Sequence, residues 1–381
     1  MSVNAEQLRT MIIESLEHQG FQVRGDQMLP PPDLDKDKLR ELHAEATNHR
    51  IERSKGGLVK YEPKLLERLA AGSEILPERI IPRLTEVQPD SEDELLFRHA
   101  TLHWSIPVSS GYGRRIRFLV IDEQNDKLIG VFGLGDPIFS LTDRDSWIGW
   151  NKADREERLH HVMDAFVLGA VPPYSFLLCG KLVAMLAASN EVREALHRKY
   201  ADRQSLIRQR TLHGQLALIT TTSALGRSSI YNRLKYGERL LYHSVGFTRG
   251  SGEFHFSNGL YSAISEFVVS NCEPTAKHDL WGTGFRSRRE TVRKTLAKVG
   301  LPEEWLYHGI RREIFMVPLA ENTKQFLRGV DFQPLWYDQS IGNLSEWFRE
   351  RWLLPRSLRD QRYKTWDPAA WKLWSKEGSH G

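Results

Sequence analysis

Hydrophobic side chains in the first hundred residues recur every three or four positions, which is the spacing of one helix face. The pattern predicts a helix over residues 5–20 that stops at Gly20, and a second over 34–53 after the proline break MLPPPD. A short third helix is predicted over 63–72, because this segment opens with proline and closes with glycine. We therefore expect an N-terminal helical lobe over residues 1–100.

After residue 100 the apolar runs become short and rich in β-branched side chains. The pattern predicts, in order, a hairpin (116–135), a strand (164–171), a helix (176–200), a strand (216–224), a helix from about Ser228 and a last strand (254–258). This alternation is typical of an α/β or α+β sandwich. We expect it to form a core over residues 101–260.

The last third of the chain predicts two further parts. Ser287 and Glu290 have the spacing of a capping box, and the helix that they predict ends before Gly300. Residues 336–381 hold six of the eleven tryptophans. We expect a basic C-terminal subdomain over 261–335 and a Trp-rich tail over 336–381, whose pattern indicates no role.

The composition is that of a globular protein from a reducing compartment. The chain has 381 residues, 40% of them hydrophobic, and its two cysteines lie far apart with no Cys or His at metal-ligand spacing. The segment MSVNAEQLRT lacks the regions of a signal peptide, and the longest uncharged run, 165–180, is too short to cross a bilayer. We expect a cytoplasmic protein with no membrane association.

Basic residues are concentrated in two regions, although the net charge is only +4. Residues 193–239 hold ten Lys and Arg against three Asp and Glu, and residues 277–312 hold nine against four. Such regions favour contact with the phosphates of nucleic acid, and we expect DNA rather than RNA. Solvated helix faces are the alternative explanation.

Several short motifs within or near these regions are candidates for anion binding. The stretch SALGRSS leads from a strand into the helix predicted from Ser228, so that amides, hydroxyls and a guanidinium would meet at a helix N-terminus, or the serines would simply cap it. In GYGRR, Tyr112 could stack on a base beside the arginines. The expected anion or nucleic-acid contacts are Arg114, Arg115, Arg227, Ser228, Ser229, Arg286, Arg288, Arg289, Arg311 and Arg312.

Three carboxylates suggest a different chemistry. Asp136, Asp143 and Asp145 lie close together in the sequence and could hold Mg²⁺ in a nuclease, although turns also favour aspartate. His160 and Asp164 are four residues apart, but two ligands do not make a metal site. We therefore predict no metal site.

The central segment resembles the core of the GCN5-related N-acetyltransferases (GNAT). The resemblance rests on VLGAVPPY, YSFLLCGKLV and the spacing L-Y-x-x-x-G-F at 241–247. It implies an α+β fold with a GNAT-like mixed, mostly antiparallel sheet flanked by helices. Two strands would part around a crevice between residues 164 and 247, where helix amides receive an acyl-CoA pyrophosphate.

The same resemblance implies site residues. Tyr242 would protonate the departing thiolate, and Asp164 would be the general base. The residues implied for acetyl-CoA or another acyl-CoA are Pro173, Tyr174, Ser175, Gly180 and Lys181. The family's phosphate loop carries two or three glycines where this chain has one, and Tyr242 could instead only pack against the sheet.

Longer blocks resemble the DruA family of the bacterial Druantia anti-phage defence system. They are SIPVSSGYGRRIRFLVIDE, KLIGVFGLGDP, RDSWIGW, MDAFVLGAVPPYSFLLCGKLVAML, TTTSALGRSSIYNRL and HGIRREIFMVPLAEN, and they extend over about residues 39–330. Cys179 stands where glycine is expected, and the tail lies outside the resemblance. The resemblance implies a role in defence, other Druantia proteins including a helicase as partners, and carriage on mobile elements.

Three hypotheses follow from these observations. In the first, the protein is a defence component that engages nucleic acid through basic surfaces, with the acetyltransferase-like core as a scaffold or nucleotide pocket. In the second, it is an acyl-CoA-dependent N-acyltransferase that acts on a nucleobase or a protein amine. In the third, it is a metal-dependent nuclease. We rank them in that order.

Overall fold

A seven-stranded sheet forms the centre of the molecule in this computed structural model, which describes residues 3–108, 113–204, 214–257, 259–275, 281 and 285–374. The strands lie in the order β10 (His243–Phe247), β11 (Glu313–Pro318), β7 (Leu218–Thr222), β6 (Val162–Ala170), β5 (Lys127–Gly135), β4 (Arg115–Asp122) and β3 (Pro82–Glu86). All neighbours are antiparallel except β6 and β7. The expected α+β class, with a mixed and mostly antiparallel sheet flanked by helices, is confirmed.

The strands β6 and β7 part after a short stretch of pairing. Their parallel register covers only Val162–Asp164 against Leu218–Thr220, and beyond it β6 continues to Ala170 paired with β5 alone. At the last shared position the Thr220 hydroxyl donates to Asp164 Oδ1 at 2.7 Å. The predicted parting of two strands is therefore present, with Asp164 at its base.

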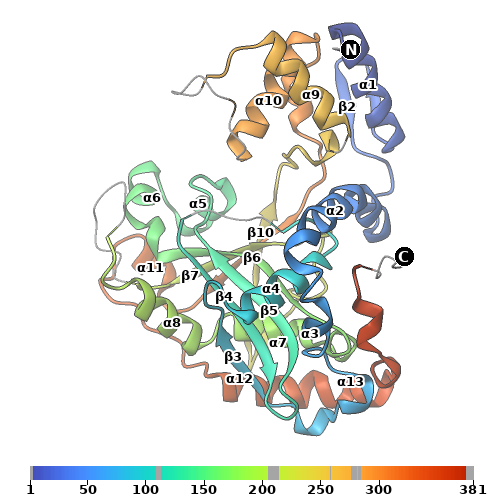
Figure 1. The fold of residues 1–381 in the computed structure, drawn as a ribbon. Helices are drawn as coiled ribbons and strands as arrows, with labels where there is room; N and C mark the ends of the chain where they lie inside the picture. The colour runs from blue at the N-terminus through green and yellow to red at the C-terminus, as the bar shows by residue number, and fades with distance from the viewer. Residues whose placement is uncertain are drawn as a thin grey trace, which may run out of the picture.

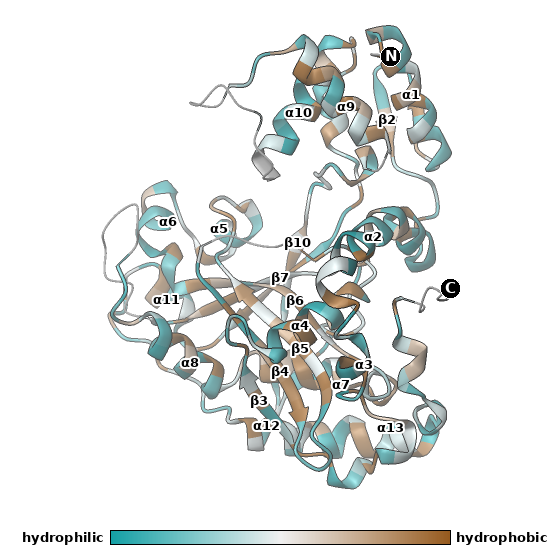
Figure 2. Ribbon diagram, in the orientation of Figure 1, coloured by the Kyte–Doolittle hydropathy of each residue, from teal (hydrophilic) through white to brown (hydrophobic). Residues whose placement is uncertain are grey.

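Helices cover both faces of the sheet (Figure 1). One face packs against α7 (Cys179–Leu186), α8 (Asn190–Tyr200) and α12 (Ile341–Phe348). The other packs against α3 (Glu62–Leu66) and α4 (Glu92–Leu102) over β4 and β5, and against α11 (Thr323–Leu327) nearer to β7 and β11. Figure 2 shows the hydrophobic strands enclosed by helices with polar outer faces. The short helices α5 (Thr142–Ile148) and α6 (Lys152–Arg158) lie at one end.

A second, smaller core joins the first forty residues of the chain to residues 254–310. It brings together α1 (Ala5–His18), the hairpin of β1 (Gln22–Arg24) and β2 (Gln27–Leu29), α9 (Gly259–Asn271) and α10 (Phe285–Lys298). Leu8, Ile12 and Leu16 of α1 are fully buried in it, as the helical spacing predicts. The first hundred residues are therefore not purely helical, since they also contain β1, β2 and β3.

The long helix α2 (Lys36–Leu58) connects this lobe to the sheet. Its N-cap is Asp35, which accepts hydrogen bonds from the amides of Asp37 and Lys38. Leu39 and Leu42 belong to the core of the lobe, whereas Leu58 is fully buried against the sheet. One side of α2 is therefore fixed at both ends by apolar contacts, and its polar side chains are free to line a surface.

Four local predictions are wrong. No helix begins at Ser228, because its Oγ accepts from the amides of Ile230 and Tyr231 in a turn, and the hairpin of β8 (Lys235–Tyr236) and β9 (Arg239–Leu240) follows. Residues 176–200 form two helices, residues 254–256 form a 3-10 turn, and the third helix ends at Leu66.

The predicted capping box of α10 is also absent. The helix already begins at Phe285, before Ser287, and the carboxylate of Glu290 instead accepts from the amide of Thr275 at 2.8 Å. Thr275, fifteen residues before Glu290, thus donates to the carboxylate that the local pattern assigned to the first amides of the helix.

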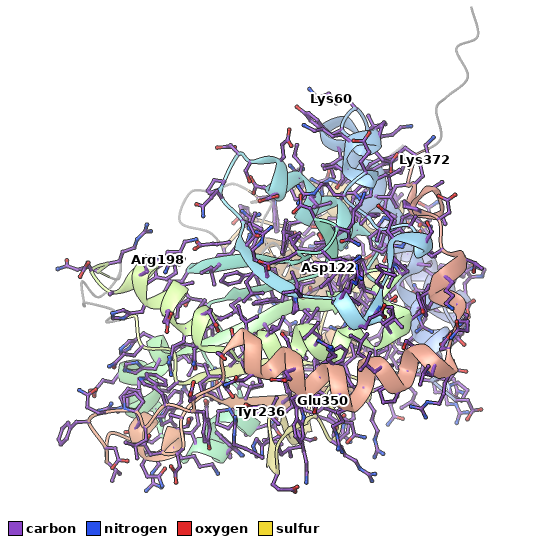
Figure 3. The ribbon with its side chains drawn as sticks, turned by 90° about the horizontal axis from the view of Figure 1, so that it is seen from below. Lys60, Asp122, Arg198, Tyr236, Glu350 and Lys372 are labelled. Atoms are coloured by element: carbon purple, nitrogen blue, oxygen red, sulfur yellow. The ribbon has the colours of Figure 1, made fainter. Side chains whose placement is uncertain are left out.

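The Trp-rich tail packs against the sheet. After α12 the chain continues through a π turn (Arg349–Leu353) and α13 (Leu354–Arg359), which run across the near side in Figure 3. Leu344, Phe348 and Leu353 of this tail are buried in the largest hydrophobic core. Trp371 reaches the far face and stacks on His103, with 3.9 Å between ring centroids. Among the described residues, none of the helices has both the length and the apolar composition that a membrane span needs.

Candidate functional site

Two cavities lie next to each other along α2. The arginine cavity, of about 740 Å³, lies between the middle of α2, the segment 248–262 and the segment 308–312. The split cavity, of about 700 Å³, lies between the start of α2, the free end of β6, the turn 172–181 and the segment 223–231. Thr222 lines the first and Ser223 the second, so the two cavities share a wall.

Both cavities are strongly basic. The lysines and arginines that line them are Lys36, Arg40, Lys181 and Arg227 in the split cavity and Arg50, Arg53, Arg288 and Arg312 in the arginine cavity. Glu253 is the one carboxylate among the described lining residues, and it already accepts from Arg289 at 3.2 Å. Low-dielectric walls lined by one sign of charge concentrate the electrostatic potential, so both cavities attract anions.

The helix α2 supplies half of these charges through its periodicity. Lys36, Arg40, His43, Arg50 and Arg53 are separated by three, four or seven residues, so that they lie on one helix face. The sequence reasoning missed this stripe, because it followed only the apolar positions of this helix. The spacing of the basic residues was the signal that could have revealed it.

The split cavity occupies the gap between the parted strands. Leu168, Gly169 and Ala170 form the β6 side, beyond the point at which β7 leaves. Lys181 in α7 donates to the carbonyls of Ser229 at 3.1 Å and Ile230 at 3.0 Å, so it joins the two walls. Burial lowers the pKa of this lysine.

The residues predicted for a cofactor only partly reach this cavity. Ser175, Gly180 and Lys181 line it. Pro173 is not among the lining residues, and Tyr174 is fully buried with its hydroxyl donating to Asp122 Oδ2 at 2.9 Å. Burial and the Asp122 carboxylate raise the pKa of Tyr174, so its hydroxyl stays protonated and holds the turn against the sheet.

Arg227, Ser228 and Ser229 line the split cavity, although not at a helix N-terminus. The Ser228 hydroxyl accepts from two amides of its own turn, and the Ser229 carbonyl accepts from Lys181. Arg227 is exposed, and within the described part of the chain its guanidinium has no hydrogen-bond or ion-pair partner. Of the three, Arg227 is therefore the residue that keeps its charge available.

Tyr242 and Asp164 line neither cavity. Tyr242 is 2% exposed, donates to the carbonyl of Ala184 at 2.8 Å and stacks on Tyr231, which does line the split cavity. Burial raises the pKa of Asp164 to about 6 at the base of the strand split. Their catalytic roles stay predictions.

The other predicted arginines are divided between the arginine cavity and structural positions. Arg288 and Arg312 line the arginine cavity. Arg289 binds Glu253, and Arg311 lies over the ring of Phe247 at 5.1 Å, so neither lines the cavity. Tyr112 and the side chain of Arg286 lie outside the described residues.

Arg114 and Arg115 lie away from both cavities. Arg114 donates to Asp136 Oδ1 at 2.8 Å and to the carbonyls of His160 and Val162. It therefore links the adjacent ends of β4, β5 and β6. The guanidinium of Arg115 lies over the ring of Phe166 at 5.2 Å. The structure therefore does not bring these two arginines to the other predicted anion contacts.

The structure contradicts the three-carboxylate metal site. Asp136 binds Arg114, and Asp145 is held by Arg144 and Arg155, each at 2.7 Å. Across the residues that are described, no three side chains from His, Cys, Asp or Glu come together as metal ligands. His160 and Asp164 do not share a helix either, since one lies in a 3-10 turn and the other in β6.

Neutral histidines stand beside the charges of the arginine cavity. Burial and the Arg312 guanidinium lower the pKa of His43 to about 3 and that of His308 to about 4. His308 accepts from the amide of Ile310 at 3.1 Å, which fixes its ring. His43 and His308 therefore add no positive charge to the cavity at neutral pH.

Comparison with known proteins gives a family. The model of the family described as "Druantia protein DruA" matches residues 33–329, most of the chain. The chain belongs to the DruA family. It is 38% identical over 367 residues to the Druantia protein DruA of Escherichia coli (strain UMEA 4076-1), covering 96% of this chain and 91% of that protein. No solved structure matches it significantly. Trp371 is the one described lining residue that lies outside the matched range.

Proposed function

We propose that this member of the DruA family is a component of anti-phage defence that engages single-stranded DNA along the two cavities of α2. Membership in the family supports the defence role. The observation that carries the DNA proposal is the set of eight lysines and arginines around two adjoining cavities, in which the one described carboxylate is already paired. The proposed partners are other Druantia proteins, a helicase among them.

The shape and lining of the cavities favour a single strand over a duplex. Each cavity is of about the volume that takes one nucleotide or a few, 740 and 700 Å³, rather than a double helix. Aromatic rings line both of them: Phe254 and Tyr261 in the arginine cavity, and Trp104 and Trp371 in the split cavity. Proteins that hold single strands combine basic grooves with aromatic rings on which bases stack.

The sheet is the proposed acetyltransferase-like core, kept as a scaffold. The order β3, β4, β5, β6, β7, with β11 between β7 and β10, and the parting at β6 and β7 support this assignment. In this proposal the gap that would hold an acyl-CoA instead forms one of the two basic cavities.

The salt dependence of binding tests the proposal. The fluorescence anisotropy of a labelled DNA strand of about 20 nucleotides is measured from about 50 to 300 mM salt, and log K is expected to fall linearly with log salt by about 0.7 per phosphate contact. An oligonucleotide of the same sequence with an uncharged backbone serves as the control. Binding that does not weaken as salt rises would exclude contact with phosphates.

An acyl-CoA transferase is a second candidate, because the split cavity lies at the strand gap and is lined by Ser175, Gly180 and Lys181. Its four basic side chains suit the phosphates of an acyl-CoA, whose thioester would supply the activated acyl group. Acetyl-CoA should then raise the melting temperature, and Tyr242→Phe should abolish turnover while that shift remains. Absence of any shift with acetyl-CoA rejects this candidate.

A further inference from the structure

Three of the four guanidiniums in the arginine cavity are unused. Arg50, Arg53 and Arg312 make no side-chain hydrogen bond or ion pair to any described residue. Arg288 donates to the Ser257 hydroxyl at 3.2 Å and lies over the ring of Tyr261 at 4.1 Å, but it has no carboxylate partner in the described part. The cavity therefore holds a cluster of like charges that the fold itself leaves unpaired.

Burial makes this cluster costly for the protein alone. Arg50 and Arg312 are half-buried, and desolvation lowers the pKa of both. Burying a charge without a partner is unfavourable, because the charge loses water and gains nothing in return. Four arginines that come from three distant segments, α2, α10 and the residues just before β11, would not be held together for stability.

A buried histidine in the same wall is also unsatisfied. His43 lines the cavity and is only 3% exposed, yet its Nδ1 has no hydrogen-bond partner among the residues described. A buried polar atom without a partner costs free energy of its own, so such atoms generally indicate a missing water or ligand. Glu253 does not neutralise the arginines of the cavity, since its carboxylate is already paired with Arg289.

We propose that the arginine cavity is a pocket for a phosphate group that carries more than one negative charge, the chemistry shared by a strand's terminal phosphate and a nucleotide's polyphosphate. An internal phosphodiester brings one charge, whereas a terminal phosphate brings about 1.5 to 2 at neutral pH. The greater charge suits four guanidiniums, which also bind phosphate oxygens in pairs. The terminal-phosphate source rests on the proposed DNA function, and the polyphosphate source does not.

Thermal unfolding of the full chain with inorganic pyrophosphate tests the pocket. A ligand that binds only the folded state at about 100 times its Kd adds about 2.7 kcal/mol, so a rise of several degrees is expected. Arg312→Met should lose that rise, while its melting temperature without ligand stays equal or higher, because an unpaired buried charge is gone. Arg227→Met, in the split cavity, is the matched control and should keep the rise.

Two results would overturn the pocket: no shift of the wild-type chain with pyrophosphate, or an undiminished shift in Arg312→Met. If Arg312→Met lowers the melting temperature in the absence of ligand, the arginine has a structural role, and the exposed Arg53→Met becomes the deciding variant. An undiminished shift in Arg53→Met then rejects the proposal.

Matched probes separate the sources of the phosphate and keep the two proposals apart. A strand with a 5′ phosphate, the same strand with a 5′ hydroxyl, and a nucleoside triphosphate are each competed against pyrophosphate. Tighter binding of the phosphorylated strand identifies a terminal phosphate, and competition by the triphosphate alone identifies a nucleotide. If pyrophosphate binds and neither strand does, the DNA function fails while the pocket stands. If both strands bind equally and pyrophosphate competes with neither, the pocket fails while the DNA function stands.

Discussion

The two cavities have the same number of basic side chains but use them differently. In the split cavity Lys181 is tied to two carbonyls and the exposed Arg40 pairs with Asp37. In the arginine cavity Arg50, Arg53 and Arg312 have no such partners within the described chain. A count of lining charges would rank the cavities as equal, although only one of them has most of its charge available.

The basic side chains are therefore of two kinds: those that hydrogen-bond or pair with other groups of the protein, and those whose charge is available to a ligand. Removing a charge of the first kind should lower stability, because carbonyls lose their donor. Removing one of the second kind should leave stability unchanged and weaken only ligand binding. Measuring both properties on the same variants therefore tests the assignment of each cavity.

The largest expected effect is on DNA binding when two unused charges are reversed. Arg50→Glu with Arg53→Glu removes two contacts and adds two repulsions, so affinity at about 50 mM salt should fall about 100-fold or more, or about 2.7 kcal/mol. Lys36→Glu with Arg40→Glu should have a smaller effect, because Arg40 is already paired.

The control for that reversal is a pair of exposed arginines that line neither cavity, Arg79→Glu with Arg359→Glu, which carries the same change in net charge. An equal loss of affinity in the control would mean that net charge, and not the cavity, governs binding. Anisotropy titrations on all three double variants check the order.

The next effect concerns Asp164, which lies at the base of the split between β6 and β7 and lines neither cavity. Burial raises its pKa from 3.8 to about 6, so the folded state favours the protonated form, and ionisation destabilises the fold as pH rises through 6. Asp164→Asn, which keeps an acceptor for Thr220, should therefore gain about 3 kcal/mol at pH 8. Urea unfolding at pH 8 and near pH 4 is the measurement, and a gain that persists unchanged near pH 4 would contradict the assigned cause.

A smaller effect distinguishes Lys181 from Arg50. Lys181→Met removes two donors from the carbonyls of Ser229 and Ile230 and should cost about 1.5 kcal/mol of stability. Arg50→Met should cost nothing measurable, but it should weaken DNA binding. Thermal unfolding compared with anisotropy shows which residue is structural, and the reverse pattern would invert the comparison.

The smallest predicted effect is at Ser228. Its hydroxyl accepts from the amides of Ile230 and Tyr231, so Ser228→Ala should cost about 1 kcal/mol. DNA affinity should stay within about twofold, because this hydroxyl is already occupied by its own turn. Ser229→Ala, which removes an exposed hydroxyl and leaves the carbonyl in place, is the control, and a large loss of affinity in Ser228→Ala would place it in direct contact with DNA.

Local signals predicted much of the sheet. The polar turn between the two apolar runs of 116–135 gave the hairpin of β4 and β5, and the run before the Pro-Pro pair gave β6. These elements depend on side chains that are close in sequence. The parting of two strands was implied by the resemblance to acetyltransferases. It is present in the structure, since β6 and β7 pair over three residues only.

Predictions failed where a distant residue takes a local partner. Glu290 was expected to cap its own helix, but it accepts from the amide of Thr275, fifteen residues away. A single sequence contains no information about which of two acceptors a donor will reach after folding. The hydroxyl of Tyr242 likewise has a partner that its local sequence does not reveal, the carbonyl of Ala184, and its catalytic role stays a prediction.

The sequence predicted only some of the residues of the candidate site, because the others belong to it only through contacts between distant segments. Arg227, Arg288 and Arg312 stood out because they lie beside recognisable strands and helices. Arg50 and Arg53 looked like an ordinary solvated helix face, and only the placement of 248–262 and 308–312 opposite them forms a cavity. Charges become a site when segments about two hundred residues apart meet.

The stacking of Trp371 on His103 affects the order in which the protein can mature. Ribosomes deliver the chain from its N-terminus, and earlier segments generally begin to fold first. Every described residue around the arginine cavity has been synthesised by position 312, whereas the other cavity lacks a wall until residue 371 emerges. The described lining of the arginine cavity is therefore synthesised before that of the split cavity is complete.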